Sequence, residues 1–145
     1  MGGEYPSGRE WNFYQDSAST SYVIAHWPTS VVFTGFESGK NVLTGAGLRE
    51  VASPNPVQRS YALYNGLTDR SSWDQVAVYY AVMTANGRQT ELWSKNSGKN
   101  TVRSNGSNYW LNKPDKTVDH AYLVQHSDTE KIADLLEQLM LPERK

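Results

Sequence analysis

One short run of apolar residues constrains most strongly what this sequence can fold into. Val31, Val32 and Phe33 follow one another without a polar break. A strand with one face in water alternates polar and apolar residues, whereas an unbroken apolar run is typical of a strand covered on both faces. The sequence therefore predicts a short core strand from Ser30 to Gly35.

Helix signals surround this strand on both sides along the chain. Asp16 is placed to cap a helix that ends near Trp27, and Ser71-Ser72 offers capping oxygens for another. A final helix begins after Ser127 or Asp128. The expected helices, with approximate bounds, are 17–27, 44–51, 54–66, 73–84 and 129–141. Helices that alternate with a buried strand indicate an α/β or α+β fold.

The pattern changes between residues 90 and 125, where Gly and Asn turns separate short segments. The Asn105-Gly106 pair lies between two of these segments and is a strong hairpin signal. The sequence thus predicts a small antiparallel β patch. With one convincing core strand and an opening segment that resembles the exit from a strand, residues 1–145 are expected to be the C-terminal portion of a larger domain. The expected patch strands are Glu91–Lys95, Asn100–Ser104, Asn108–Leu111 and Ala121–Val124.

Composition argues against several classes of partner. Lys and Arg number 14 against 15 Asp and Glu, so no basic stripe favours a nucleic-acid partner. No apolar run approaches the ~20 residues that cross a bilayer, so no membrane partner is expected. The chain has no cysteine, which excludes disulfides and thiolate metal sites. His26, His120 and His126 lack metal-ligand spacing and are expected on the surface or in loops. The sequence does not indicate the cellular compartment of the protein.

Two polar constellations are candidates for chemistry. Glu10 and Asn12 lie two residues apart in a segment expected to be extended or turning, which would point both side chains the same way. A carboxylate beside an amide suits the hydroxyls of a sugar. The alternative is a capping network for the helix near Asp16. At the start of a later helix, Trp73 offers a flat face beside the Asp74 carboxylate, although the helix dipole favours a carboxylate there without any ligand.

Three motifs, in the same order along the chain, resemble those of one family. Residues 1–3 read Met-Gly-Gly and residues 10–18 read Glu-Trp-Asn-Phe-Tyr-Gln-Asp-Ser-Ala. They resemble the Met-Gly-Gly, Glu-Phe-Asn and Asp-Pro-Glu-Ala segments of the inosine-uridine-preferring nucleoside hydrolases. Residues 73–78, Trp-Asp-Gln-Val-Ala-Val, are similar to that family's His-Asp-Pro-Leu-Ala-Val segment, and residues 122–124 with the final helix resemble the end of its chains.

The resemblance implies an open α/β sheet with helices on both sides and a site at the carboxyl ends of the strands. The implied reaction is hydrolysis of a ribonucleoside N-glycosidic bond through an oxocarbenium-like transition state. Calcium would hold two ribose hydroxyls and the attacking water, with Asp74 as one ligand. By the same resemblance, Glu10 and Asn12 would hold ribose hydroxyls and Met1 would line the ribose pocket. Trp73 would stack on the base, which favours a purine-type nucleoside.

The family's N-terminal aspartate cluster, which supplies most calcium ligands and the general base, is not among the 145 residues. One carboxylate cannot complete a site of roughly six to eight oxygens. No catalytic residue is therefore expected on this chain, which alone is expected to be inactive and to work with an N-terminal portion of the same protein. Two alternatives remain open: a related protein that binds or processes another carbohydrate, and a non-catalytic binding module. A homo-oligomer is also possible, since family members are often dimers or tetramers.

Overall fold

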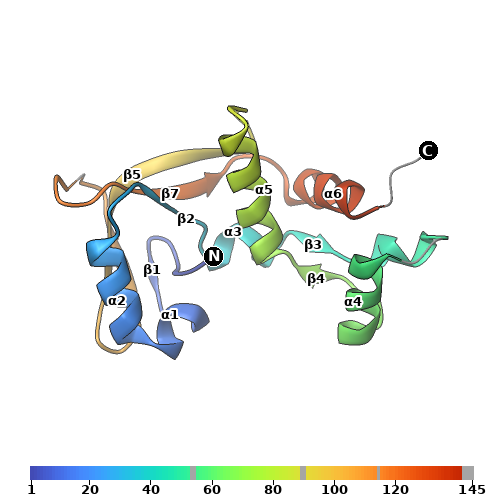
Figure 1. Cartoon of the computed structure of the whole chain (residues 1–145), viewed down its shortest axis with the longest axis horizontal. Coiled ribbons are helices and arrows are strands. Elements are labelled where there is room, and N and C mark those ends of the chain that lie inside the picture. The colour runs from blue at the N-terminus through green and yellow to red at the C-terminus, as the bar shows by residue number, and fades with distance from the viewer. Residues whose placement is uncertain (53–54, 89–90, 114, 142–145) are drawn as a thin grey trace.

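The computed structural model, which describes residues 1–52, 55–88, 91–113 and 115–141, is a mixed α/β structure (Figure 1). Its larger sheet has the strand order β1-β6-β5-β7-β2, in which only β2 and β7 run parallel. Two very short strands, β3 and β4, pair separately. The strands are β1 (Ser7–Gly8), β2 (Val31–Phe33), β3 (Leu43–Thr44), β4 (Arg70–Ser71), β5 (Trp93–Val102), β6 (Asn108–Leu111) and β7 (His120–Gln125).

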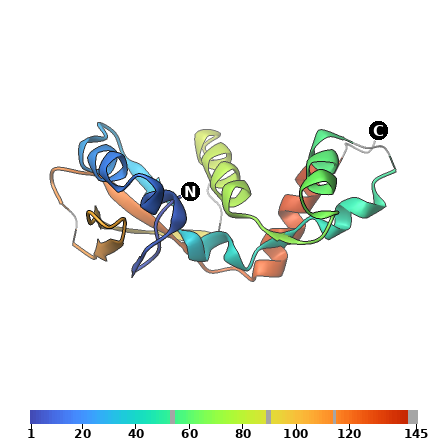
Figure 2. The same cartoon turned by 90° about the horizontal axis from the view of Figure 1, so that it is seen from below.

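The helices divide between the two ends of the molecule. Figures 1 and 2 place α1 and α2 at one end, α4 and α6 at the other, and α5 between them. The helices are α1 (Trp11–Gln15), α2 (Ser17–His26), α3 (Phe36–Lys40), the 3₁₀ helix η1 (Ala46–Glu50), α4 (Pro56–Asn65), α5 (Trp73–Ala85) and α6 (Thr129–Met140).

Consecutive residues of β7 show that both faces of the sheet are covered. Side chains alternate between faces along a strand. Tyr122 packs in a cluster with Phe13 and Ile24, from α1 and α2, whereas Leu123 packs in a cluster with residues of α5 and α6. The structure thus places helices against both faces. The core members on the Leu123 side are Val42, Val76, Leu92, Trp93, Ile132, Ala133 and Leu136.

Three predictions that rest on local capping chemistry are confirmed, at the starts of α2 and α6 and at the end of α4. Asp16 accepts a hydrogen bond from the Ser19 N–H at the start of α2, and Asp128 accepts one from the Glu130 N–H at the start of α6. The helix expected after residue 54 begins at Pro56 and ends before Gly66, which is left-handed. Each of these signals acts within one turn of helix, so the sequence alone is sufficient to find it.

Other predictions are wrong for reasons that lie outside the local sequence. The segment around Glu10 and Asn12, expected to be extended or turning, contains the helix α1, and the short strand β1 precedes it. The two strands expected over 91–95 and 100–104 are parts of one strand, β5. Gly98, a residue type that favours turns, lies inside that strand. A Cβ at this position would lie 2.3 Å from the Leu111 carbonyl oxygen, so the position requires glycine. A glycine in a strand can therefore mark a close backbone approach.

The apolar run 31–33 forms a strand as predicted, but β2 is the last strand of the sheet rather than an interior one. Val31 and Val32 are only half-buried. The strand that is covered throughout its first four residues is β7. The sequence of β2 is therefore more apolar than its position at the sheet edge requires.

Candidate functional site

A pocket of about 430 Å³ lies between the N-terminal segment and the start of α5. All five residues that the resemblance selects line it: Met1, Glu10, Asn12, Trp73 and Asp74. We call it the Glu10–Asp74 pocket. The amino terminus lies beside α3 and α5 in both views (Figures 1 and 2). Residues more than sixty positions apart in the sequence are thus brought to one cavity.

Glu10 is buried in the wall of this pocket and holds the backbone around it. Its exposed fraction is 5%. One carboxylate oxygen accepts from the Asn12 N–H at 2.8 Å, and the other accepts from the N–H groups of Gly3 at 3.1 Å and Phe13 at 3.3 Å. Glu10 is therefore the N-cap of α1 and ties the N-terminal segment to that helix. The alternative of a capping role is confirmed, although the capped helix is α1 and not the helix after Asp16.

Asn12 lies in the first turn of α1. The segment is helical from Trp11, so the two side chains do not follow an extended backbone, and that part of the prediction is wrong. Asn12 is exposed, and its Nδ2 donates to the Met1 carbonyl oxygen at 3.3 Å and lies 3.6 Å from the Met1 Sδ. Its Oδ1 has no partner among the described residues. The amide is thus held against Met1 with its acceptor free.

Trp73 is fixed by contacts to α3. Its indole N–H donates to the Phe36 carbonyl oxygen at 2.8 Å, and the two rings are stacked with centroids 5.5 Å apart. A Cβ at Gly39 would lie 2.4 Å from the Trp73 Cα, so only glycine allows α3 to approach the start of α5 this closely. Trp73 is half-buried, which leaves part of its ring at the pocket.

Asp74 lies in the first turn of α5 with its side chain exposed. No described residue donates a hydrogen bond to its carboxylate. The Ser72 side chain does not cap α5 as expected; its Oγ bonds to the Thr44 Oγ1 at 2.7 Å, and its N–H donates to the Val42 carbonyl at 2.9 Å. These buried contacts fix where α5 begins. The helix dipole favours the negative charge of Asp74 at that end.

Five further residues of the pocket are not found by sequence reasoning. They include two cations, each held over an aromatic ring: the Arg9 guanidinium lies 3.7 Å from the Tyr14 ring centroid, and that of Arg70 lies 4.2 Å from the Tyr64 centroid. The only sequence signal that could have selected these two cations is their position, since Arg9 directly precedes Glu10 and Arg70 directly precedes Ser71-Ser72. The five are Glu4, Arg9, Trp11, Phe36 and Arg70.

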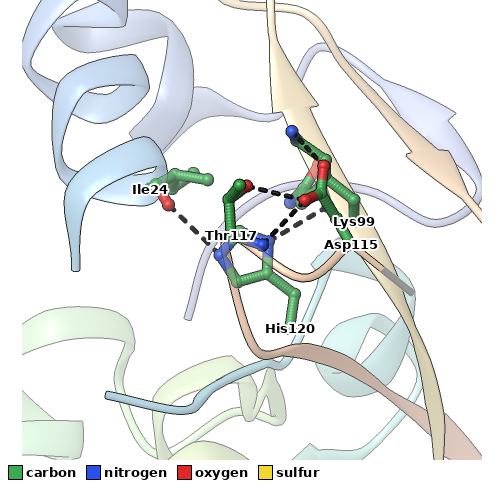
Figure 3. A network of polar contacts seen from close by, with 6 residues as sticks. Ile24, Lys99, Asp115, Thr117 and His120 are labelled. Carbon is green, nitrogen blue, oxygen red and sulfur yellow. Dashed lines mark hydrogen bonds and ion pairs between the residues drawn. The ribbon is translucent and has the colours of Figure 1, made fainter. Parts of the chain in front are cut away.

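A second polar cluster, outside the pocket, surrounds a buried histidine (Figure 3). His120 is 3% exposed, so its assignment to a surface or loop is wrong. Its Nδ1 accepts from the Asn100 N–H at 3.3 Å, which assigns the proton to Nε2, and Nε2 then donates to the Ile24 carbonyl at 3.1 Å. Burial lowers the pKa of His120, which favours the neutral ring.

An ion pair lies close to this histidine. The Asp115 carboxylate accepts from the Lys99 Nζ at 2.6 Å and from the Thr117 N–H and Oγ (Figure 3). The hydrogen bond from Lys99, followed by those from Thr117, lowers the pKa of Asp115. His120 itself joins α2 to β5 and β7 through its two nitrogens. Each polar atom named here has a protein partner, so the cluster is accounted for by its role in the fold.

Comparisons with known protein families, with curated proteins and with solved structures give no match for this chain. In the described ranges, no helix is both long and apolar enough to cross a bilayer. No group of three or more His, Cys, Asp or Glu side chains in the same ranges is arranged to hold a metal ion. The arrangement of the Glu10–Asp74 pocket is therefore the basis for a functional proposal.

Proposed function

We propose that this chain is the C-terminal portion of a nucleoside-hydrolase-like protein and supplies ribose-binding side chains to its site. One observation supports this proposal above the others: the five residues chosen by resemblance, from motifs at positions 1–12 and 73–74, all line one pocket. The intact protein would hydrolyse the N-glycosidic bond of a ribonucleoside, with a purine-type base favoured by Trp73.

The free hydrogen-bonding capacity of the pocket suits a sugar with adjacent hydroxyls. The Asn12 Oδ1 can accept from a hydroxyl, and the open Asp74 carboxylate can accept from others or bind a cation. Glu10 uses three of about four acceptor positions on backbone N–H groups, which leaves about one for a hydroxyl. Met1 contributes a wall of the pocket and holds the Asn12 amide in place. The roles of Glu10 and Asn12 are thus positioning combined with ribose contact.

Calcium belongs to this proposal only together with an N-terminal portion of the same protein. Calcium takes roughly six to eight oxygen ligands. The described residues offer Asp74 as one open carboxylate and no group of three acidic or histidine side chains that could hold a metal. The residues of this chain alone do not fit a complete calcium site, and the general base is also assigned to the N-terminal portion.

A second candidate function, binding of a different carbohydrate, is favoured by the aromatic side chains of the pocket. Trp11, Phe36 and Trp73 all line it, and the Trp11 side chain is 67% exposed. Flat aromatic faces also pack against sugar rings that carry no base. A ligand that keeps the ribose and lacks the base distinguishes the two functions.

The proposal is tested by calcium and nucleoside calorimetry on the intact protein. Asp74→Ala is expected to abolish calcium binding because it removes a hard oxygen ligand. Asp134→Ala, which removes an exposed carboxylate from α6, is the matched control and should leave the calcium affinity unchanged. Unchanged calcium affinity in Asp74→Ala would rule out the assignment of this residue. Equal affinity for a purine nucleoside and for free ribose would favour the second candidate.

A further inference from the structure

A second cavity adjoins the Glu10–Asp74 pocket at the start of α5. It has a volume of about 470 Å³, which lies within the range of small-molecule sites. Arg70, Trp73 and Asp74 line both cavities, so the two meet around the first turn of α5. We call the second cavity the α5 groove. Its other lining residues are Val57, Ser71, Gln75, Val78, Tyr79, Val82, Leu136, Leu139 and Met140.

The α5 groove lies on the side of α5 that faces α4 and α6. Figures 1 and 2 show α5 between the amino terminus and these two helices. Val57 of α4 and Leu136 and Leu139 of α6 form its far walls. Arg70 and Asp74, which stand at the boundary of the two cavities, are both exposed. The boundary is therefore open to solvent, and one ligand can occupy both cavities.

The face of α5 that lines the groove changes from polar to apolar along the helix. Asp74, Val78 and Val82 recur every four residues, so they lie in one row on that face. The row is about 12 Å long, because a helix rises about 1.5 Å per residue. It begins with a carboxylate at the Glu10–Asp74 pocket and continues with two valines. A ligand along this row meets a charged group at one end and apolar side chains beyond it.

The apolar side chains of the groove are not needed to fill the core. Val78, Val82 and Leu139 are each more than half exposed. The core on this side of the sheet is filled by other residues of the same two helices, such as Val76 and Ile132. Helices α5 and α6 thus present a second apolar surface to the groove. A ligand that covers this surface gains the free energy of removing it from water.

The polar residues of the groove gather at its Asp74 end, and the fold already holds two of them. The Ser71 Oγ donates to the Lys40 carbonyl at 2.6 Å. The Gln75 Nε2 donates to the Tyr61 hydroxyl at 2.8 Å. A polar ligand would therefore find few free partners beyond Asp74, whereas an apolar group needs none. The chemistry of the groove thus suits the apolar part of a ligand whose polar part lies in the neighbouring pocket.

We infer that the ligand of the Glu10–Asp74 pocket carries an apolar extension, which lies in the α5 groove along Val78 and Val82. This inference rests on the proposed function and narrows its substrate class to ribonucleosides whose base bears a long alkyl or alkenyl substituent. Trp73 lines both cavities, so a base stacked on it would direct its substituent away from the ribose and toward α6.

The test compares adenosine with hexyladenosine, in which a hexyl chain replaces one hydrogen of the exocyclic amine of the base. Calorimetry on the intact protein measures the affinity of each nucleoside. Each methylene removed from water contributes roughly fourfold in affinity, and ordering the chain offsets part of this gain. Hexyladenosine should therefore bind about 30-fold more tightly than adenosine, or better.

Val78→Gln places a polar side chain in the middle of the groove. It should reduce the ratio of the two affinities to less than about threefold, because the hexyl chain would then cover a polar group. Leu63→Gln is the matched control, since Leu63 is an equally exposed aliphatic residue of α4 that lines neither cavity. This control should keep the full ratio. Both positions are exposed, and circular dichroism should show the wild-type fold in each variant.

Three results would overturn the inference. The first is equal affinity of the wild type for the two nucleosides, because the groove would then be closed to the substituent or covered by another part of the protein. The second is an unchanged ratio in Val78→Gln, since the hexyl chain would then lie elsewhere. The third is self-association in analytical ultracentrifugation that Val78→Gln abolishes, because a second copy of the chain would then occupy the groove.

The outcome is separable from that of the proposed function. If both nucleosides bind equally and both lose affinity in Asp74→Ala, the groove inference fails and the ribose-site assignment stands. If adenosine does not bind, while the hexyl-substituted base without ribose binds and loses affinity in Val78→Gln, the groove keeps its apolar ligand and the ribose-site assignment is lost.

Discussion

Two carboxylates line the same pocket and have opposite surroundings. Glu10 is 5% exposed and accepts hydrogen bonds from three backbone N–H groups. Asp74 is exposed at the start of α5 and accepts none from the described residues. A carboxylate whose acceptor positions are filled by the protein stabilises the fold, whereas one with open positions is available to a ligand. The Glu10 carboxylate is thus used mainly by the fold, whereas the acceptor positions of the Asp74 carboxylate are open among the described residues.

The largest expected effect tests the structural half of this contrast. Glu10→Ala leaves three N–H groups without their acceptor, and we expect the free energy of unfolding to fall by about 2–4 kcal/mol. Asp74→Ala should change it by less than about 0.5 kcal/mol. Urea denaturation of both variants measures the difference. Glu10→Gln keeps an acceptor oxygen and should be intermediate; equal losses in Glu10→Ala and Asp74→Ala would remove the contrast.

Substitutions at Trp73 distinguish a side chain that stacks on a ligand from one that only packs within the fold. Trp73→Ala in the intact protein should weaken the binding of a purine nucleoside by roughly 1–3 kcal/mol, which is the range for base stacking on an aromatic ring. Free ribose should lose much less affinity. Trp73→Phe keeps an aromatic face but loses the hydrogen bond to the Phe36 carbonyl, and it controls for that bond. Equal losses for nucleoside and ribose would show that Trp73 only supports the fold.

His120 extends the contrast to a basic group. Its pKa is lowered by burial, so the unfolded chain binds this proton more readily than the folded chain. Its contribution to stability is complete above the ordinary histidine pKa of 6.5 and is lost as the pH falls through the lower folded value. The urea midpoint of the wild type should therefore decline as the pH is lowered below 6.5. The decline should be absent in His120→Gln and unchanged in His126→Gln, which removes an exposed ring.

Asp115 has a depressed pKa as well, and its effect falls in a different pH window. Its stabilising contribution is present above the ordinary aspartate pKa of 3.8 and is lost at lower pH. Urea midpoints should therefore show a further decline below pH ~4 in the wild type, and this decline should be absent in Lys99→Met, which removes the ion pair. A decline below pH ~4 that is unchanged in Lys99→Met would exclude the ion pair as its cause.

The smallest expected effect is at Asn12. Asn12→Ala removes one exposed amide, so the free energy of unfolding should change by less than about 0.5 kcal/mol. Ribose-containing ligands should bind about 1 kcal/mol more weakly through the loss of one hydrogen bond. Calorimetry on the intact protein, with Asn86→Ala as an exposed control, measures this. Unaltered ligand affinity would remove Asn12 from the site.

The sequence predicts the parts of this molecule that depend on neighbouring residues. The roles of Asp16, Asp128 and Gly66 follow from the sequence because caps act within one helical turn. Those of Gly98 and His120 do not, because their surroundings come from Leu111 and from α2, far away along the chain. Long-range packing of this kind leaves no local pattern in a single sequence.

The candidate site shows the same division. The resemblance selects residues from two distant motifs, and the structure places them around one pocket. It does not select Phe36 or Arg70, which reach the pocket through the packing of α3 and α4 near the start of α5. Nor can it show that Glu10 is largely occupied by backbone N–H groups, since the bond from Gly3 depends on how the N-terminal segment folds back.

The convergence of Asn12 and Asp74 on one pocket is tested most directly by cross-linking. The chain contains no cysteine, so Asn12→Cys with Asp74→Cys gives a single thiol pair. The control pair uses Asn12→Cys with Asn86→Cys, which lies at the other end of α5, about 18 Å from Asp74 along the helix. A short bifunctional thiol reagent should link the first pair within one molecule and leave the control pair unlinked. Failure to link the first pair, or equal linking in both pairs, would contradict the proposed site.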